Sequence, residues 1–248
     1  MYKFYTIFKR DVINLVKNPT LLMFNTAFPF LLILILGFLS SGSYGKSGID
    51  AYDYYGITIL LYIALNVSVT AANSFMEKSL KNSNLRIMYS PISISFIYLS
   101  KIAATFAFTS VCFMALAAAS GLLLGVNFGG GNTIYTIIMV LLLDLLSSSL
   151  GVMFCCIFKS EELTNKILST ANNILAVLGG LFFQLDGFGR TVEGLTCISP
   201  VKWVVQGIFR IIYDNDFSWF YPTVLILLVL SAAMVLLCKL TFRTEDYL

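Results

Sequence analysis

The chain has 248 residues, of which 58% are hydrophobic and only 12% charged, and its mean hydropathy is +0.86. This composition predicts an integral membrane protein rather than a water-soluble domain. The sequence contains no histidine. That absence excludes histidine proton relays, HExxH zinc sites, serine–histidine proteases and histidine ligation of haem within this chain.

Six apolar stretches are long enough to cross a bilayer as helices, which takes about 20 residues. Only helices and closed barrels satisfy their backbone polar groups in lipid. We therefore expect an all-α membrane protein, a single transmembrane domain over 1–248, with spans at about 21–39, 55–75, 102–126, 134–158, 167–183 and 221–240. Pro29 interrupts the first span, which a helix bundle tolerates. We interpret that span as retained, because its apolar run is too long for a signal peptide.

Lysine and arginine predict the orientation of these spans. With the N-terminus inside, twelve of these cations lie in cytoplasmic segments and four outside, at Lys46, Arg190, Lys202 and Arg210. This bias follows the positive-inside rule and places both termini in the cytoplasm. The net charge of +3 follows from the same bias, and no basic run with interleaved aromatics indicates nucleic-acid binding.

The first 19 residues have the pattern of an amphipathic helix. Phe4, Phe8, Val12 and Leu15 recur at helical spacing, with basic residues largely on the opposite side. Such a helix fits the inner membrane interface, with its cations among the lipid headgroups. The alternative is a flanking helix packed on the bundle. Pro19 marks its end.

The sequence offers no nucleotide or metal site of its own. The segment 42–47 resembles the end of a Walker A loop, but Ser40 stands where the motif needs its first glycine, and no strand precedes it. The five cysteines follow no metal or disulfide spacing. We expect no enzymatic activity, no bound metal and no cofactor in this chain.

Polar residues inside the spans are candidates for a substrate path. Asp144 is the one acidic residue well inside a span, and it is either functional or a carboxyl bonded to hydroxyls of a neighbouring helix. The second and fifth spans carry further candidates, for which contact between helices is the alternative. These are Thr58, Asn66, Ser68, Thr70, Asn73, Thr170, Asn172 and Asn173.

Two loops carry more information than the spans. The cytoplasmic loop 77–93 is charged at its start, has apolar residues at helical spacing, and meets Pro91 before the next span. It is a short helix that docks into a protein groove, or a connecting loop. Its candidate contact residues are Glu77, Leu85, Arg86, Met88, Tyr89 and Pro91.

The segment 184–219, outside in this topology, has apolar runs too short to cross the bilayer. We expect re-entrant or interfacial helices here, with Trp203 and Trp219 at headgroup level. Surface helices without a role in transport are the alternative.

These loops resemble those of ABC-2 type transporter permeases. The start at Glu77-Lys78, the stretch from Leu85 to Ser93 and the later Lys101 resemble the family's cytoplasmic coupling loop. Ser199, Pro200 and Trp203 look like its Ser-Pro-x-x-Trp signature. One departure is 82–84, where the family commonly has glycine and threonine. The resemblance extends over essentially the whole chain.

The resemblance implies a type V exporter-like fold and the membrane subunit of a bacterial ABC exporter, in the inner (cytoplasmic) membrane. The loop 77–93 would be the coupling helix that contacts the ATPase. The implied partners are two copies of an ABC ATPase, which carry ATP and magnesium, a second permease subunit, identical or homologous, and membrane lipids. The implied substrate is hydrophobic or amphipathic: a drug, an antimicrobial peptide or a lipid-like molecule.

Two other classes of protein compete with this interpretation. A secondary transporter driven by an ion gradient would need paired intramembrane acids or discontinuous helices, and Asp144 alone is thin support. An intramembrane enzyme would need a catalytic group that the spans lack.

Overall fold

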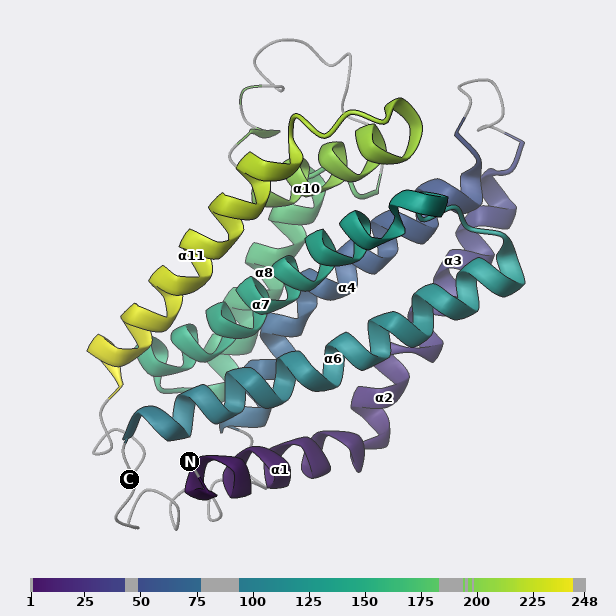
Figure 1. Ribbon diagram of the computed structural model, residues 1–248. Helices are drawn as coiled ribbons and strands as arrows, with labels where there is room; N and C mark the ends of the chain where they lie inside the picture. Colours follow the sequence, from purple (N-terminus) through teal and green to yellow (C-terminus); the bar gives the residue numbers. More distant parts are fainter. Residues whose placement is uncertain are drawn as a thin grey trace.

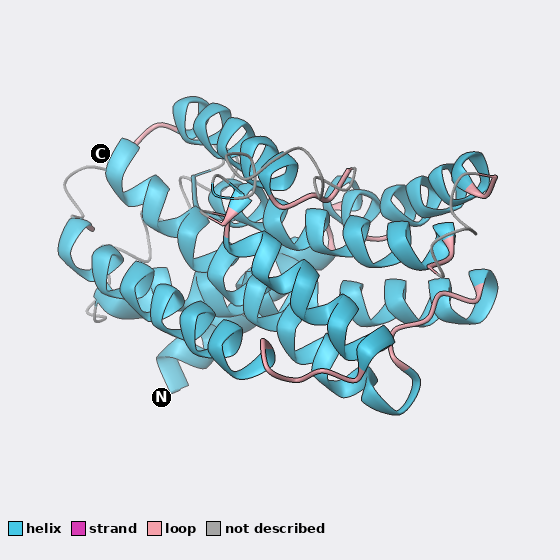
Figure 2. Cartoon of the chain, turned by 90° about the horizontal axis from the view of Figure 1, so that it is seen from above, coloured by secondary structure: helices cyan, strands magenta, loops and turns pink. Residues whose placement is uncertain are grey.

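The computed structural model describes residues 2–42, 49–76, 94–182, 194, 196–197 and 199–242. This part of the chain contains helices and connecting loops and no strand, as Figures 1 and 2 show. The prediction of an all-α fold is therefore confirmed for these residues. α1 and the last turns of α11 lie at the same end of the bundle (Figure 1).

Five helical segments in the described ranges are long and apolar enough to cross a membrane. The first is α2 (Pro19–Asn25) continued by α3 (Ala27–Ser40), and the others are α4 (Ala51–Met76), α6 (Ile94–Leu124), α7 (Thr133–Phe158) and α11 (Phe220–Thr241). The predicted bounds of α7 and α11 agree within one residue. α6 begins eight residues before the predicted 102, because Ile94–Lys101 continue the helix with only one charge.

α4 is the central helix and the most buried of the five segments. It contacts α3, α6, α7, α8 (Glu161–Leu178) and α10 (Pro200–Phe209). α7 approaches it closely at Gly151, where an added Cβ would lie 2.1 Å from the carbonyl oxygen of Ser68. Only glycine permits this distance, so Gly151 sets how tightly the two central helices pack.

The first predicted span is two helices with a break at Thr26. Pro29 cannot donate a backbone hydrogen bond, and its ring crowds the carbonyl of Asn25, four residues earlier. The side chains of Asn25 and Thr26 bond back to the carbonyls of Leu21 and Leu22, at 2.8 and 2.6 Å. The helix axis therefore changes direction here, with α2 and α3 drawn at different tilts in Figure 1.

α1 (Tyr2–Val16) packs along α6. Leu15 joins Ala104, Phe108 and Cys112 in a small apolar cluster. The structure thus shows the packed side of this amphipathic helix, whereas its place in the membrane interface stays a prediction.

The fifth predicted span, 167–183, differs most from expectation. α8 begins earlier, at Glu161, where Ser160 caps its N-terminus by accepting a hydrogen bond from the amide of Leu163. It ends at Leu178, and it is not among the five segments that are apolar enough to cross a membrane. The reason is its polar content, since two glutamates, three asparagines and a lysine lie within its 18 residues.

α10 and the π-helical turn η2 (Arg210–Asp214) form the described part of the predicted re-entrant segment 184–219. Together they are about 22 Å long at 1.5 Å per residue, shorter than the bilayer hydrocarbon. Their apolar residues face the bundle, with Val201, Val204, Ile208 and Ile211 fully buried. The predicted coupling loop 77–93 lies outside the described residues, and so do its candidate residues.

Candidate functional site

A row of polar side chains joins α4 to α8 through the middle of the bundle. We call it the α4–α8 seam and define it by seven residues: Tyr62, Asn66, Ser68, Asn73, Asn165, Asn172 and Asn173. Four of them are the asparagines predicted to line a path. They come together because α4 and α8 run antiparallel side by side.

Asn172 is the buried centre of the seam, with only 2% of its surface exposed. Its amide nitrogen donates to Ser68 Oγ at 2.9 Å and to Asn66 Oδ1 at 3.3 Å. Asn66 in turn donates to the carbonyl of Tyr62, 2.9 Å away. In an apolar medium these bonds hold the two helices in one register.

The seam extends to both ends of the helix pair. Asn165 Nδ2 donates to Asn73 Oδ1 at 2.6 Å near one end. Tyr62 donates its hydroxyl to Asn173 Oδ1 at 3.1 Å. At the other end the hydroxyl of Tyr54 donates to the carbonyl of Gly180 at 2.7 Å. α8 and the glycines after it therefore lie beside α4 through most of the length of α4.

One face of α8 carries exposed polar residues, Glu162, Lys166, Thr170 and Asn173, at helical spacing, and Lys166 pairs with Glu162 at 2.6 Å. Leu163, Ile174 and Val177 are exposed beside them. The exposed face of α11 is apolar instead, with Tyr221, Leu225, Leu228, Val229, Leu236, Leu237 and Leu240. The α11 face suits acyl chains, and the α8 face suits water or protein.

The other path candidates lie away from this face. Thr58 is buried and its hydroxyl bonds to the carbonyl of Tyr54 in its own helix, at 2.9 Å. Thr70 is buried as well. The burial of both residues fits packing inside the bundle better than a path lining.

Asp144 is fully buried between α7 and α6 rather than on the seam. The hydroxyl of Thr109 lies 2.9 Å from both carboxyl oxygens, and Ser110 Oγ lies 3.2 Å from Oδ2. The hydroxyls that hold it come from α6, and not from its neighbours Ser147 and Ser148. No second acidic residue bonds to it within the described part of the chain.

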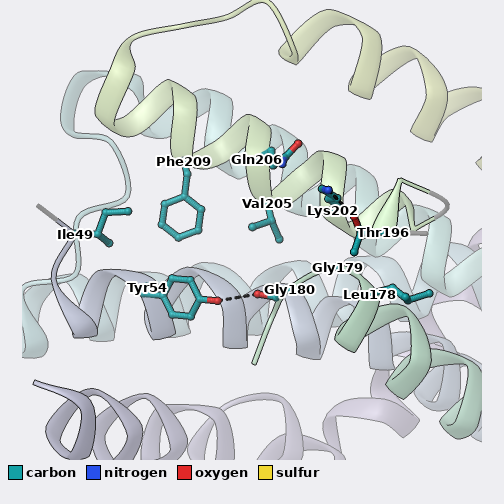
Figure 3. Close-up of a pocket in the computed structure, with 10 residues that line it drawn as sticks. All are labelled: Ile49, Tyr54, Leu178, Gly179, Gly180, Thr196, Lys202, Val205, Gln206 and Phe209. Atoms are coloured by element: carbon teal, nitrogen blue, oxygen red, sulfur yellow. Dashed lines mark hydrogen bonds between the residues drawn. The ribbon is translucent and has the colours of Figure 1, made fainter. Parts of the chain in front are cut away.

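A cavity of about 190 Å³ lies at the end of the seam where Tyr54 meets Gly180 (Figure 3). The end of α8 forms one side with Leu178, Gly179 and Gly180. α10 forms the opposite side with Lys202, Val205, Gln206 and Phe209, and Ile49, Tyr54 and Thr196 complete the lining. The cavity therefore lies between α4, the end of α8 and α10.

The residues of the Ser-Pro-x-x-Trp pattern hold α10 in place. Ser199 is buried and donates its hydroxyl to the carbonyl of Leu175 on α8, at 3.0 Å. Pro200 begins α10, a position where its missing amide hydrogen costs nothing. Trp203 Nε1 donates to the carbonyl of Cys197 at 3.1 Å, and its ring packs edge-on against Trp219.

A second group of bonds closes this end of the bundle. Asp53, in the first turn of α4, accepts from the backbone amide of Asn127 and from the hydroxyl of Tyr213, both at 2.7 Å. Burial, followed by the bond to Asp53, raises the pKa of Tyr213 above its ordinary value. Asp53 therefore joins two elements to the start of α4. Asn127 belongs to the connection between α6 and α7, and Tyr213 belongs to η2.

Lys202 and Gln206 were missed as site residues in the sequence. Their spacing of four residues on one helix places both on the cavity wall, and that spacing was the available signal. Asp11, which pairs with Lys101, was missed too. In the described ranges no three histidine, cysteine or acidic side chains are grouped so that they could hold a metal ion.

A family model described as ABC-2 type transporter matches residues 2–213 of the chain. The match extends from α1 into η2 and therefore includes the α4–α8 seam and the cavity. A comparison with curated protein sequences found no match.

Proposed function

Because this chain belongs to the ABC-2 type transporter family, we propose that it is the membrane subunit of an ATP-driven exporter. In this proposal it moves a hydrophobic or amphipathic molecule, such as a drug, an antimicrobial peptide or a lipid-like compound, out of the cell. Permeases of this family work with an ABC ATPase partner. The chain would thus be a transport subunit, with ATP and magnesium bound on that partner.

The polar face of α8 is the observation that carries the proposal. Glu162, Lys166, Thr170 and Asn173 are exposed on a helix that runs antiparallel to the central α4. Charged and amide groups are costly in contact with acyl chains, so they face protein or a water-filled cavity. A second permease subunit, identical or homologous, would supply the opposite wall of that path.

In this proposal α8 is the sixth membrane crossing. Its bonds to α4 run from Asn165 with Asn73 at one end to Gly180 with Tyr54 at the other. These contacts cover about 28 Å of α4 at 1.5 Å per residue, close to the hydrocarbon thickness. α8 is too polar to resemble a span that faces lipid. A helix that lines a path needs such polar residues.

Energy would enter through the cytoplasmic loop 77–93. ATP binding closes the pair of ATPases, and a coupling helix around Leu85 and Met88 would transmit that movement to α4 and α6, which flank the loop in the chain. The bundle then changes between two packings that nucleotide binding favours differently.

A secondary transporter, the competing function, has less support. Proton or ion coupling in a membrane commonly uses paired acids or relays of titratable groups. Asp144 bonds to the hydroxyls of Thr109 and Ser110 instead, away from the polar face of α8.

The test is reconstitution of the chain with its ABC ATPase partner. Proteoliposomes are loaded with ATP on the ATPase side, and transport of a panel of fluorescent amphiphiles and peptides is followed. We expect transport that needs ATP and stops when Leu85→Asp and Met88→Asp are combined. ATP hydrolysis by the separated ATPase serves as the control for its integrity.

Two results would refute the proposal. One is that the double variant still binds the ATPase and transports normally, which would show that loop 77–93 does not couple the ATPase to transport. The other is transport driven by a proton or sodium gradient without ATP, which would favour the secondary transporter.

A further inference from the structure

We propose that the cavity between α4, α8 and α10 is a binding site for the anionic headgroup of an amphiphile, a carboxylate or a phosphate attached to an alkyl chain. The cavity contains one cationic side chain, Lys202, and one amide, Gln206, on the same wall. Thr196 also lines it, and Ile49, Tyr54, Leu178, Val205 and Phe209 give the remaining side-chain surface a mainly apolar and aromatic character (Figure 3). This combination matches a ligand with a charged head and an apolar neighbour.

The Lys202 ammonium group has hydrogen bonds left to donate. It is half-buried and bonds to the hydroxyl of Thr196, its one acceptor among the described residues. An ammonium group has three donors, so two remain for a ligand. A partly buried cation without a carboxylate partner is stabilised by an anion, because the charged hydrogen bond offsets lost hydration.

Three described carboxylates at this end of the bundle have hydrogen bonds elsewhere. Asp53 accepts from Asn127 and Tyr213, and Asp50 accepts from the amide of Ala51 at 2.7 Å. Asp216 accepts from Ser218 and lies 3.4 Å from Arg210. Among the described residues that line the cavity, Lys202 is the one charged side chain.

The cavity has room for a headgroup. Its volume is about 190 Å³, and it is partly open. An alkyl chain attached to the headgroup can therefore extend out of the cavity. Gly179 lets the end of α8 pack closely on α10 beside the cavity, since an added Cβ would lie 2.9 Å from Val201.

The cavity also lies where a molecule would leave the path. It begins just beyond the α4–α8 seam, at the bond between Tyr54 and Gly180. If the exporter function holds, on which this part of the inference rests, the site receives the head of an exported amphiphile before release. An anionic amphiphile is then the substrate class.

Binding is tested with the full chain in phosphatidylcholine nanodiscs, without the ATPase. Decanoate and decyl phosphate are titrated, and fluorescence is followed from the two tryptophans, of which Trp203 adjoins Lys202. We expect saturable binding of both anions and none of decyltrimethylammonium. Inorganic phosphate and acetate are titrated in parallel, and much weaker binding of these free anions would show that the alkyl chain contributes.

Lys202→Met should weaken binding about tenfold or more, the effect of losing one charge-assisted hydrogen bond. Lys202→Arg should retain binding, and Gln206→Leu should weaken it less than Lys202→Met. Lys239→Met, which removes an exposed lysine at the end of α11, is the matched control for the loss of one charge and should bind like the wild type.

Equal affinity of Lys202→Met and wild type, or equal binding of the cationic amphiphile, would overturn the proposal. If Lys202→Met fails to fold, two other results test the proposal. The wild type should bind the anions and not decyltrimethylammonium, and Gln206→Leu should bind the anions more weakly than the wild type. Because binding is measured without ATP, its failure is separable from a failure of the proposed function. Intact binding with no ATP-driven transport would refute the exporter function alone.

Discussion

At the residue scale, the ion pair between α1 and α6 is the most buried charge interaction in the described part of the chain. Lys101 Nζ lies 2.7 Å from Asp11 Oδ1, and the two side chains are 3% and 6% exposed. Ser100 Oγ adds a bond to the second oxygen of Asp11 at 3.2 Å. Lys101 is also the lysine of the family-like pattern after loop 77–93. The structure therefore gives that lysine a partner on α1.

Removing one member of this pair should be strongly destabilising. Lys101→Met leaves Asp11 charged and buried without a partner, so we expect a loss of about 3–5 kcal/mol in the free energy of unfolding. Denaturation in mixed detergent micelles, followed by helix content, measures it. The control combines Lys101→Met with Asp11→Leu, which should recover most of the loss. A single variant as stable as the wild type would contradict the pair's contribution.

Tyr213 predicts a pH dependence at the alkaline end. Its pKa is raised in the folded protein, chiefly by burial and then by the bond to Asp53. The neutral hydroxyl thus contributes stability below the unfolded pKa of about 10, and this contribution is lost as pH rises toward the folded pKa.

The measurement compares thermal unfolding of wild type and Tyr213→Phe between pH 8 and pH 11. We expect the wild type to lose more stability above pH 10 than the variant does. Tyr221→Phe, which alters an exposed tyrosine, is the control and should follow the wild type. Parallel curves for wild type and Tyr213→Phe would disprove the role of this hydroxyl.

At the scale of elements, α8 and α11 show how one chain builds helices for two surroundings. α11 exposes leucines and valines, and its single charge, Lys239, lies in its last turn. α8 exposes Glu162, Lys166, Thr170 and Asn173 and buries Leu168 and Ala176. The difference separates a helix that faces lipid from one that faces the proposed path.

Two adjacent asparagines on α8 should respond differently to replacement by leucine. Asn172→Leu removes the buried bonds to Ser68 and Asn66, so we expect a loss of about 1 kcal/mol in the free energy of unfolding. Asn173→Leu changes an exposed side chain, so stability should change less, whereas ATP-driven transport should fall. Denaturation and the proteoliposome assay measure the two effects. Equal effects on both properties would contradict this division.

At the scale of the whole molecule, the helices form a bundle with two distinct ends. α1 and the end of α11 lie at one end (Figure 1). The other end holds the turn at Asn127, η2, and the cavity, joined by the bonds of Asp53. With both termini cytoplasmic, as the positive-inside rule predicts, this closed end faces outward.

Cys197 provides a test of that orientation. It is the one exposed cysteine, whereas Cys112, Cys155, Cys156 and Cys238 are buried free thiols. A membrane-impermeant maleimide added to spheroplasts should therefore label the wild type, and Cys197→Ser should abolish the labelling. Labelling that appears only after the membrane is permeabilised would reverse the orientation.

The sequence predicted most of the helices and only part of the site. The bounds of α7 and α11 followed from their apolar runs, because lipid requires a helix of that length. Four of the five asparagines of the seam, all but Asn165, were recognised, since amides in a span need partners. Their pairings, and the separation of Asp144 from them, depend on which helices become neighbours, and hydropathy does not contain that information.

The composition and order of the apolar runs by themselves determined that this is a multi-pass membrane protein, and the loops indicated its family. Only the tertiary structure decided that α8 runs antiparallel to α4, that Lys101 meets Asp11, and that Lys202 lines a cavity with Tyr54. The physical reason is that a long apolar run forms a helix in lipid whichever helices become its neighbours. Contacts between helices depend instead on shape and hydrogen bonding between residues that are far apart in the sequence.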